Sequence, residues 1–104
     1  MDTQQVETID SVTQWADATF GQATIQAMFE RACKEMQELQ LAMQYADGPI
    51  IAMEAADVCI CLYRMIGTLD RMALDKKMAI NRARTWKLDG NGCAQHVKDQ
   101  KEQQ

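Results

Sequence analysis

Apolar side chains recur at three- and four-residue spacing along most of the chain, which is the period of an amphipathic helix. A first helix is predicted over about residues 2–20, and Gly21 ends it. The second begins near Thr24, a suitable N-cap residue, and holds the longest seam in the sequence. The members of that seam are Ile25, Met28, Phe29, Ala32, Met36, Leu39 and Met43.

The third predicted helix, over about residues 49–66, is apolar on nearly every face. It follows a sharp break at Gly48 and Pro49, since Pro suits the first turn of a helix. We expect Gly67 to end it. Because no clean polar stripe remains on this helix, we expect it to lie in the middle of its domain.

The rest of the chain is less regular. Thr68 or Asp70 is expected to cap a fourth helix that runs to about Trp86. A polar, turn-rich loop is predicted over residues 87–92, then a short helix over about 93–98 and a frayed tail over 99–104. Four main helices with short connections, in a chain with one Pro and five Gly, predict an all-α antiparallel four-helix bundle. Its 104 residues are enough for one domain, residues 1–104.

Two pairs of acidic residues stand on apolar-striped stretches. Glu54 and Asp57 are three positions apart on the third helix, so their side chains share one face. Glu35 and Glu38 repeat this spacing beside the seam of the second helix. Pairing the two helices would gather four carboxylates around one cavity, and an oxygen-only ligand set is typical of Mg²⁺ and Mn²⁺ sites.

Purely structural roles for these residues also fit the sequence. Glu35 and Glu38 alone would fit a solvated helix face, and Glu54 and Asp57 would fit a buried salt bridge with Arg64. The predicted fourth helix carries a polar and basic stripe of Lys77, Asn81 and Arg84. This stripe would fit a solvated face equally well. Beside a carboxylate site, it would instead bind phosphate groups.

Charge and cysteine content narrow the class of protein. A net charge of −4 argues against binding to a nucleic-acid backbone. The four cysteines are interpreted as reduced thiols of a cytoplasmic protein, since no secretory leader is seen. Acids interrupt the longest apolar run, so no membrane span is predicted. Cys59 and Cys61 are assigned to the core, and the spacing of Cys93 and His96 is too weak a basis for a zinc site.

The order of the motifs resembles that of the MazG-like all-α nucleoside triphosphate pyrophosphohydrolases. The hallmark of that family is Glu-x-x-Glu followed after a loop by Glu-x-x-Asp, present here as Glu35 to Glu38 and Glu54 to Asp57. Within it, the chain looks most like the dATP/dGTP pyrophosphohydrolase branch found in phages and bacteria. The features shared with that branch are Trp15 with Thr19-Phe20-Gly21, Lys34-Glu35, Lys77, Asn81, Ala83-Arg84-Thr85-Trp86 and Gln95-His96-Val97.

This resemblance implies an enzyme that binds Mg²⁺, with Mn²⁺ as a substitute, and splits dGTP or dATP into monophosphate and pyrophosphate. The four acids would hold the metal, and Glu35 or Glu38 would orient or deprotonate the attacking water. The substrate contacts would come from Trp15, Lys77, Asn81 and Arg84.

The family also implies a homodimer or homotetramer, which would be located in the host cytoplasm if a phage encodes the chain. An apolar third helix agrees with such assembly, because one short bundle hardly covers every face of it. Two departures concern selectivity for base or sugar. Arg31-Ala32-Cys33 stands where many members have a His, and Arg82 replaces an acid.

Two alternatives remain. One is a pyrophosphohydrolase for another nucleotide, such as dUTP or dCTP. The other is a non-enzymatic helical interaction module, whose acids would form salt bridges with Lys77 and Arg84.

Overall fold

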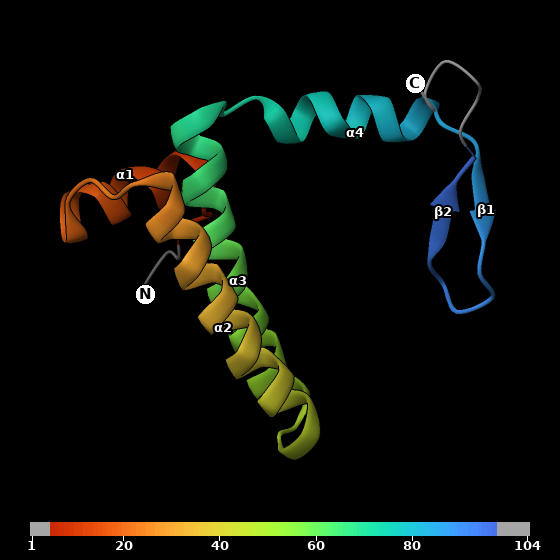
Figure 1. The fold of residues 1–104 in the computed structure, drawn as a ribbon, viewed down its shortest axis with the longest axis horizontal. Coiled ribbons are helices and arrows are strands. Elements are labelled where there is room, and N and C mark those ends of the chain that lie inside the picture. The colour runs from red at the N-terminus through yellow and green to blue at the C-terminus, as the bar shows by residue number, and fades with distance from the viewer. Residues whose placement is uncertain (1–4, 98–104) are drawn as a thin grey trace. The chain divides into compact units, whose positions relative to one another are not determined.

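The computed structural model describes residues 5–97, and the chain divides into two compact units, one up to Met72 and the other from Ala73. The described part of the first unit contains α1 (Ile9–Phe20), α2 (Ile25–Tyr45) and α3 (Gly48–Leu69) (Figure 1). The second contains α4 (Ala73–Ala83) and the strands β1 (Trp86–Leu88) and β2 (Ala94–His96). The predicted helical class is therefore confirmed, with the addition of a small two-stranded sheet.

Short polar side chains fix where the three helices of the first unit begin. Thr8 and Ser11 form a capping box at α1, each side chain accepting from the other's backbone N–H. Thr24 caps α2 as predicted. Asp47 caps α3 by accepting from the backbone N–H of Ile50, and Pro49 occupies the first turn.

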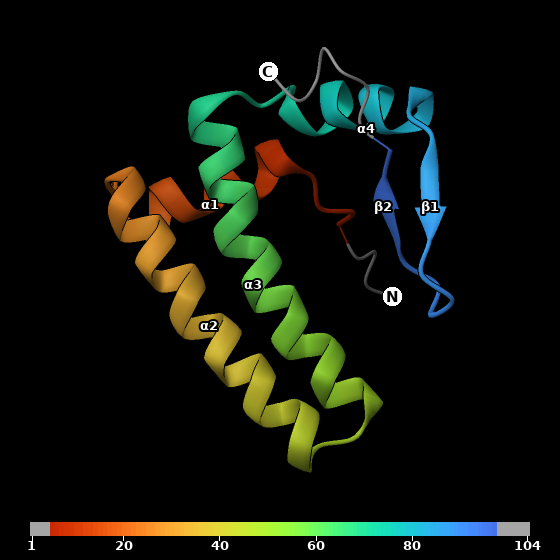
Figure 2. The ribbon, with the colours of Figure 1, turned by 45° about the vertical axis from the view of Figure 1, so that its right-hand side comes forward.

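The helices α2 and α3 form a hairpin, and they lie side by side along their length in both ribbon views (Figures 1 and 2). The connection between them consists of Ala46 and Asp47, so the two helices run antiparallel. α1 packs against α3. The third helix thus contacts both other helices of its unit, and the central position predicted for it is borne out there.

Gly67 does not end the third helix, contrary to the prediction. The helix continues to Leu69, and Asp70 forms its C-cap. A side chain at Gly67 would overlap the hydroxyl group of Thr13 on α1. That hydroxyl donates to the backbone oxygens of Ile9, at 2.7 Å, and of Tyr63, at 3.4 Å. The glycine is therefore needed for the close approach of α1 and α3.

The core of the described chain consists of a few small or medium side chains. The buried apolar residues are Val12, Ala16, Met28, Ala32 and Val58. Large apolar side chains on α2 and α3 remain exposed, among them Met43 at 63%, Ile50 at 51% and Met53 at 70%. The interior of the first unit is small for the amount of apolar surface that its helices carry.

After α4, the described part of the second unit forms an antiparallel β-hairpin, where a loop and a short helix were predicted. β1 pairs with β2 so that Trp86 faces His96, with their rings edge to face at 5.9 Å. Asp89 closes the turn by accepting from the backbone N–H groups of Asn91 and Cys93. Gly90 and Gly92 have positive φ, which a continuing helix does not allow. The predicted helix over 93–98 is wrong in its described part.

The limits of the first and fourth helices differ from the predicted ones. The first helix begins at Ile9, later than predicted, because Thr8 provides the cap. The fourth ends at Ala83, before the predicted limit near Trp86. The tail over 99–104 lies outside the described residues. A four-helix bundle formed as one domain remains a prediction. No helix within residues 5–97 combines the length and apolar character needed to cross a bilayer.

Candidate metal centre

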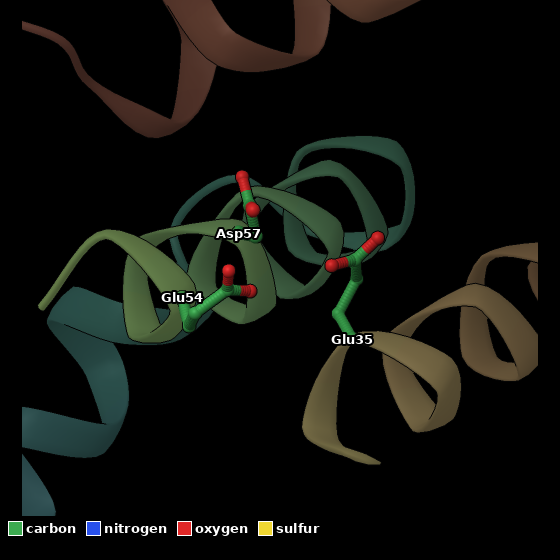
Figure 3. A group of neighbouring side chains, drawn as sticks. All are labelled: Glu35, Glu54 and Asp57. Atoms are coloured by element: carbon green, nitrogen blue, oxygen red, sulfur yellow. The ribbon is translucent and has the colours of Figure 1, made fainter. Parts of the chain in front are cut away.

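Three of the four predicted acids meet between the hairpin helices. Ligand oxygens of Glu35, Glu54 and Asp57 all lie within 4.8 Å of one another. Glu35 comes from α2, and the other two stand one turn apart on α3 (Figure 3). The fixed three-residue spacing and the antiparallel hairpin together produce this convergence. The pairing of the two acidic motifs across two helices, predicted from sequence, is present in the structure.

Glu38 is the predicted acid that the structure leaves outside this group. It is exposed on α2, one turn beyond Glu35. Glu35 and Glu54 are half-buried and Asp57 is exposed. Although the third helix is apolar on nearly every face, its two acids are therefore not enclosed in the core, because α3 turns part of this face to solvent. The exposure leaves the acid group open to a cation or a substrate from solution.

The group has the donor set that a hard divalent cation prefers. All of its donors are carboxylate oxygens, and their formal charge of −3 would exceed the charge of one such ion. Mg²⁺ and Mn²⁺ favour oxygen donors and keep some coordination positions for water or phosphate. A site that is partly open to solvent allows those positions to be filled from outside. The residues present therefore fit Mg²⁺ or Mn²⁺.

A cation from the chain already contacts one of the three acids. The Arg31 guanidinium lies 2.7 Å from a carboxylate oxygen of Glu35, one turn away on α2. The Arg31 side chain is 65% exposed, whereas that of Glu35 is only 13% exposed. Their i, i+4 spacing is visible in the sequence, so this pair could have been predicted from the sequence.

Arg64 has a different role from the one considered in the sequence. It donates to Asp17 of α1, at 3.0 and 3.3 Å, and to the backbone oxygen of Gly21. Its side chain is only 12% exposed. Arg64 thus ties the end of α1 to α3, and it is Asp17 that it pairs with, not Glu54 or Asp57.

A cavity of about 450 Å³ adjoins the acid group within the first unit. Trp15 and Phe20 of α1 form one part of its lining, with their rings edge to face at 5.3 Å. Trp15 is 54% exposed, so it is available to a ligand and is not a core residue. The remaining lining residues are Ala16, Arg31, Glu35, Asp57, Ile60, Cys61 and Arg64. Aromatic faces, guanidinium groups and carboxylates therefore border one space.

Cys61 lies in this lining and was assigned to the core from sequence. Burial raises the pKa of its thiol, and the negative charges of Glu35 and Asp57 raise it further, against a smaller opposing effect of Arg31. The thiol thus stays protonated at neutral pH. A thiol sulfur is a soft ligand, whereas the carboxylate oxygens of the acid group are the donors that hard cations prefer.

The predicted phosphate-binding residues belong to the second unit. Lys77 is exposed on α4, and Asn81 is half-buried near its end. Arg84 follows the helix, so the predicted helical stripe does not include all three residues. Trp86, whose role was not anticipated, donates from its indole N–H to the backbone oxygen of Asn81 at 2.9 Å. The Asn81 side-chain oxygen is buried and accepts no hydrogen bond within residues 5–97.

Comparison with known proteins gives one informative similarity. The chain is 38% identical over 91 residues to a dATP/dGTP diphosphohydrolase of Salmonella phage PMBT28. The match covers 85% of this chain but only 30% of the phage protein. No family model matches the chain, and no solved structure matches it. The name of this relative agrees with the dATP/dGTP branch that the sequence resembles, and the present chain spans less than a third of its length.

Proposed function

We propose that this protein is a metal-dependent hydrolase that cleaves dATP or dGTP into monophosphate and pyrophosphate. The observation that carries the proposal is the convergence of Glu35, Glu54 and Asp57 from two helices at the edge of a cavity. The similarity to a phage dATP/dGTP diphosphohydrolase supports the same substrate class. We also propose that the chain belongs to the MazG-like enzymes, which its acidic motifs resemble.

In the proposed site, Glu35, Glu54 and Asp57 bind Mg²⁺ or Mn²⁺ through their carboxylate oxygens. A bound divalent ion would offset part of the negative charge of the triphosphate and polarise the bond to be broken. Trp15 and Phe20, which line the same cavity, offer aromatic surface at which a purine base would stack. The chain would thus bind the phosphates and the base of one nucleotide in a single space.

Glu38 is the proposed general base. It stands one turn from Glu35 on α2 and is exposed, and it takes no part in the group of three acids. A water molecule would attack the α-phosphorus, the bond to the bridging oxygen would break, and pyrophosphate would leave. Glu38 would accept the proton from that water. Lys77, Asn81 and Arg84 are proposed to bind phosphate and sugar, as the family resemblance implies.

We also propose that the working unit is a dimer or tetramer. Exposed apolar side chains follow α2 and α3, and the buried core of the described chain consists of five residues. A second copy covering such a face would remove this surface from water, at about 25 cal/mol per Å² of apolar area. Sedimentation at micromolar protein concentration tests this assembly.

The direct test is to incubate the protein with each deoxynucleoside triphosphate and Mg²⁺ and to separate the products. Formation of dAMP or dGMP together with pyrophosphate is expected, and excess chelator should abolish it. Release of inorganic phosphate would contradict the proposed cleavage position. If no nucleotide were cleaved, the non-enzymatic interaction module would be the better interpretation.

A further inference from the structure

Arg31 lies where it could either bind a substrate phosphate or compete with a metal ion for Glu35. Its guanidinium contacts Glu35, which is one of the three acids, and its side chain lines the cavity beside them. A carboxylate oxygen that accepts from a guanidinium at 2.7 Å is less available to a metal ion. A divalent ion beside the acids would also repel the guanidinium.

The other guanidinium of the cavity is not free to play this part. Arg64 is held by Asp17 and by the backbone oxygen of Gly21, and its side chain is only 12% exposed. Arg31, by contrast, is 65% exposed and pairs with a neighbour on its own helix. Because the guanidinium itself lies mostly in water, it can leave Glu35 without losing a buried position, and a divalent ion would take its place beside the largely buried carboxylate.

We propose that Arg31 exchanges between Glu35 and the phosphates of the bound nucleotide, and thereby couples metal binding to nucleotide binding. This inference rests on the proposed function. Without nucleotide, Arg31 neutralises part of the acid group and weakens its affinity for a divalent ion. With nucleotide present, Arg31 turns to a phosphate oxygen, for which a guanidinium is a strong donor. Glu35 is then left to the metal.

Such coupling is reciprocal and can be measured at equilibrium. Binding of Mn²⁺ is followed by electron paramagnetic resonance, with and without a dATP analogue whose α,β-methylene bridge blocks cleavage. In the wild type, the analogue should tighten Mn²⁺ binding. In Arg31→Ala, Mn²⁺ without analogue should bind about twofold to fivefold more tightly, since a competing cation is gone.

The same variant should bind the analogue about tenfold more weakly in the presence of Mn²⁺, because a charge-assisted phosphate contact is lost. Changes of opposite sign for the two ligands are a result that a purely structural role would not give. Arg31→Lys keeps a cation and should recover part of the coupling. Lys34→Ala is the matched control, since it removes one exposed positive charge from the same helix.

The possible results separate this inference from the function on which it rests. If the wild type binds Mn²⁺ and cleaves dATP while Arg31→Ala changes neither affinity, the role of Arg31 is wrong and the proposed function stands. Equal effects in Lys34→Ala would also overturn it, because general charge would then explain the result. A wild type that neither binds Mn²⁺ nor cleaves a nucleotide would refute both.

Discussion

Replacing Glu54 by Gln should stabilise the protein in the absence of metal and remove its response to metal. The three acids have ligand oxygens within 4.8 Å of one another. Two unit charges at that distance repel by about 0.9 kcal/mol at the dielectric constant of water and by about 3.5 kcal/mol at an effective value near 20. Glu54→Gln would relieve two such repulsions while keeping the shape of the side chain.

The smaller of these values is the relevant one. Asp57 is exposed and Glu54 is only half-buried, so water screens the group. The guanidinium of Arg31 also offsets part of the charge of Glu35. We therefore expect Glu54→Gln to raise the free energy of unfolding without metal by about 1–2 kcal/mol. For a domain of this size, about 1 kcal/mol corresponds to a rise in Tm of about 4–8 °C.

With Mg²⁺ bound, the wild type should have a higher Tm than Glu54→Gln, the reverse of the order expected without metal. A ligand at a hundred times its Kd stabilises the folded state by about 2.7 kcal/mol, so saturating Mg²⁺ should raise the Tm of the wild type by about 10 °C or more. Glu54→Gln should gain little, because one of its three carboxylate ligands is lost. Thermal melts followed by circular dichroism, with Mg²⁺ and with chelator at one protein concentration, would measure both effects.

Glu30→Gln is the matched control for this experiment. It makes the same chemical change on an exposed position of α2, outside the group of acids. Its Tm should stay close to that of the wild type, with and without Mg²⁺. In 1 M salt, where the Debye length is about 3 Å, the advantage of Glu54→Gln should shrink. A lower Tm for Glu54→Gln in chelator, or an equal rise for Glu30→Gln, would refute the reasoning.

Three further predictions concern packing, assembly and the thiol. Gly67→Ala should lower stability by about 1–3 kcal/mol in a chemical denaturation series, because its methyl group would overlap Thr13 at the α1–α3 contact; an unchanged midpoint would refute that contact. Sedimentation at micromolar concentration should show a species heavier than the 11.8 kDa chain, and a single species at that mass would contradict the proposed assembly. Because burial raises the pKa of Cys61, its contribution to stability is fully present below the ordinary thiol pKa and is lost as pH rises through the raised value. Alkylation mapped by mass spectrometry near pH 8 should therefore be slower at Cys61 than at the exposed Cys59, and equal rates would be the contrary result.

The helices could be predicted from the sequence because their apolar period extends over many residues. Thr24, for example, precedes a seam of several turns, which predicts a cap, and it caps α2 in the structure. The β-hairpin of β1 and β2 could not be predicted in this way, because strands of three residues are too short to establish an alternating pattern. Gly67 resembles a helix end in the sequence because its partner, Thr13, is distant in sequence. Local signals alone did not distinguish a helix end from a close helix contact.

Part of the candidate site could also be predicted from the sequence. The spacing of Glu54 and Asp57 placed both on one face of a helix, and the structure brings Glu35 to them. The sequence could not show that Glu38 stays outside the group, because the choice depends on how the two helices are rotated against each other. It also gave no sign that Arg64 would pair with Asp17, since that contact joins two helices far apart in the chain.

The measurement that tests the central proposal most directly combines Mg²⁺, nucleotide and the acid group in one assay. Wild-type protein and Glu54→Gln are each incubated with dATP or dGTP, with Mg²⁺ or with excess chelator, and the products are separated by ion-exchange chromatography. We predict deoxynucleoside monophosphate and pyrophosphate in equal amounts from the wild type with Mg²⁺ alone. Loss of one of the three metal ligands should slow Glu54→Gln by about a hundredfold or more, equivalent to about 2.7 kcal/mol of transition-state stabilisation. Equal turnover by Glu54→Gln, or by the wild type in chelator, would contradict the proposal.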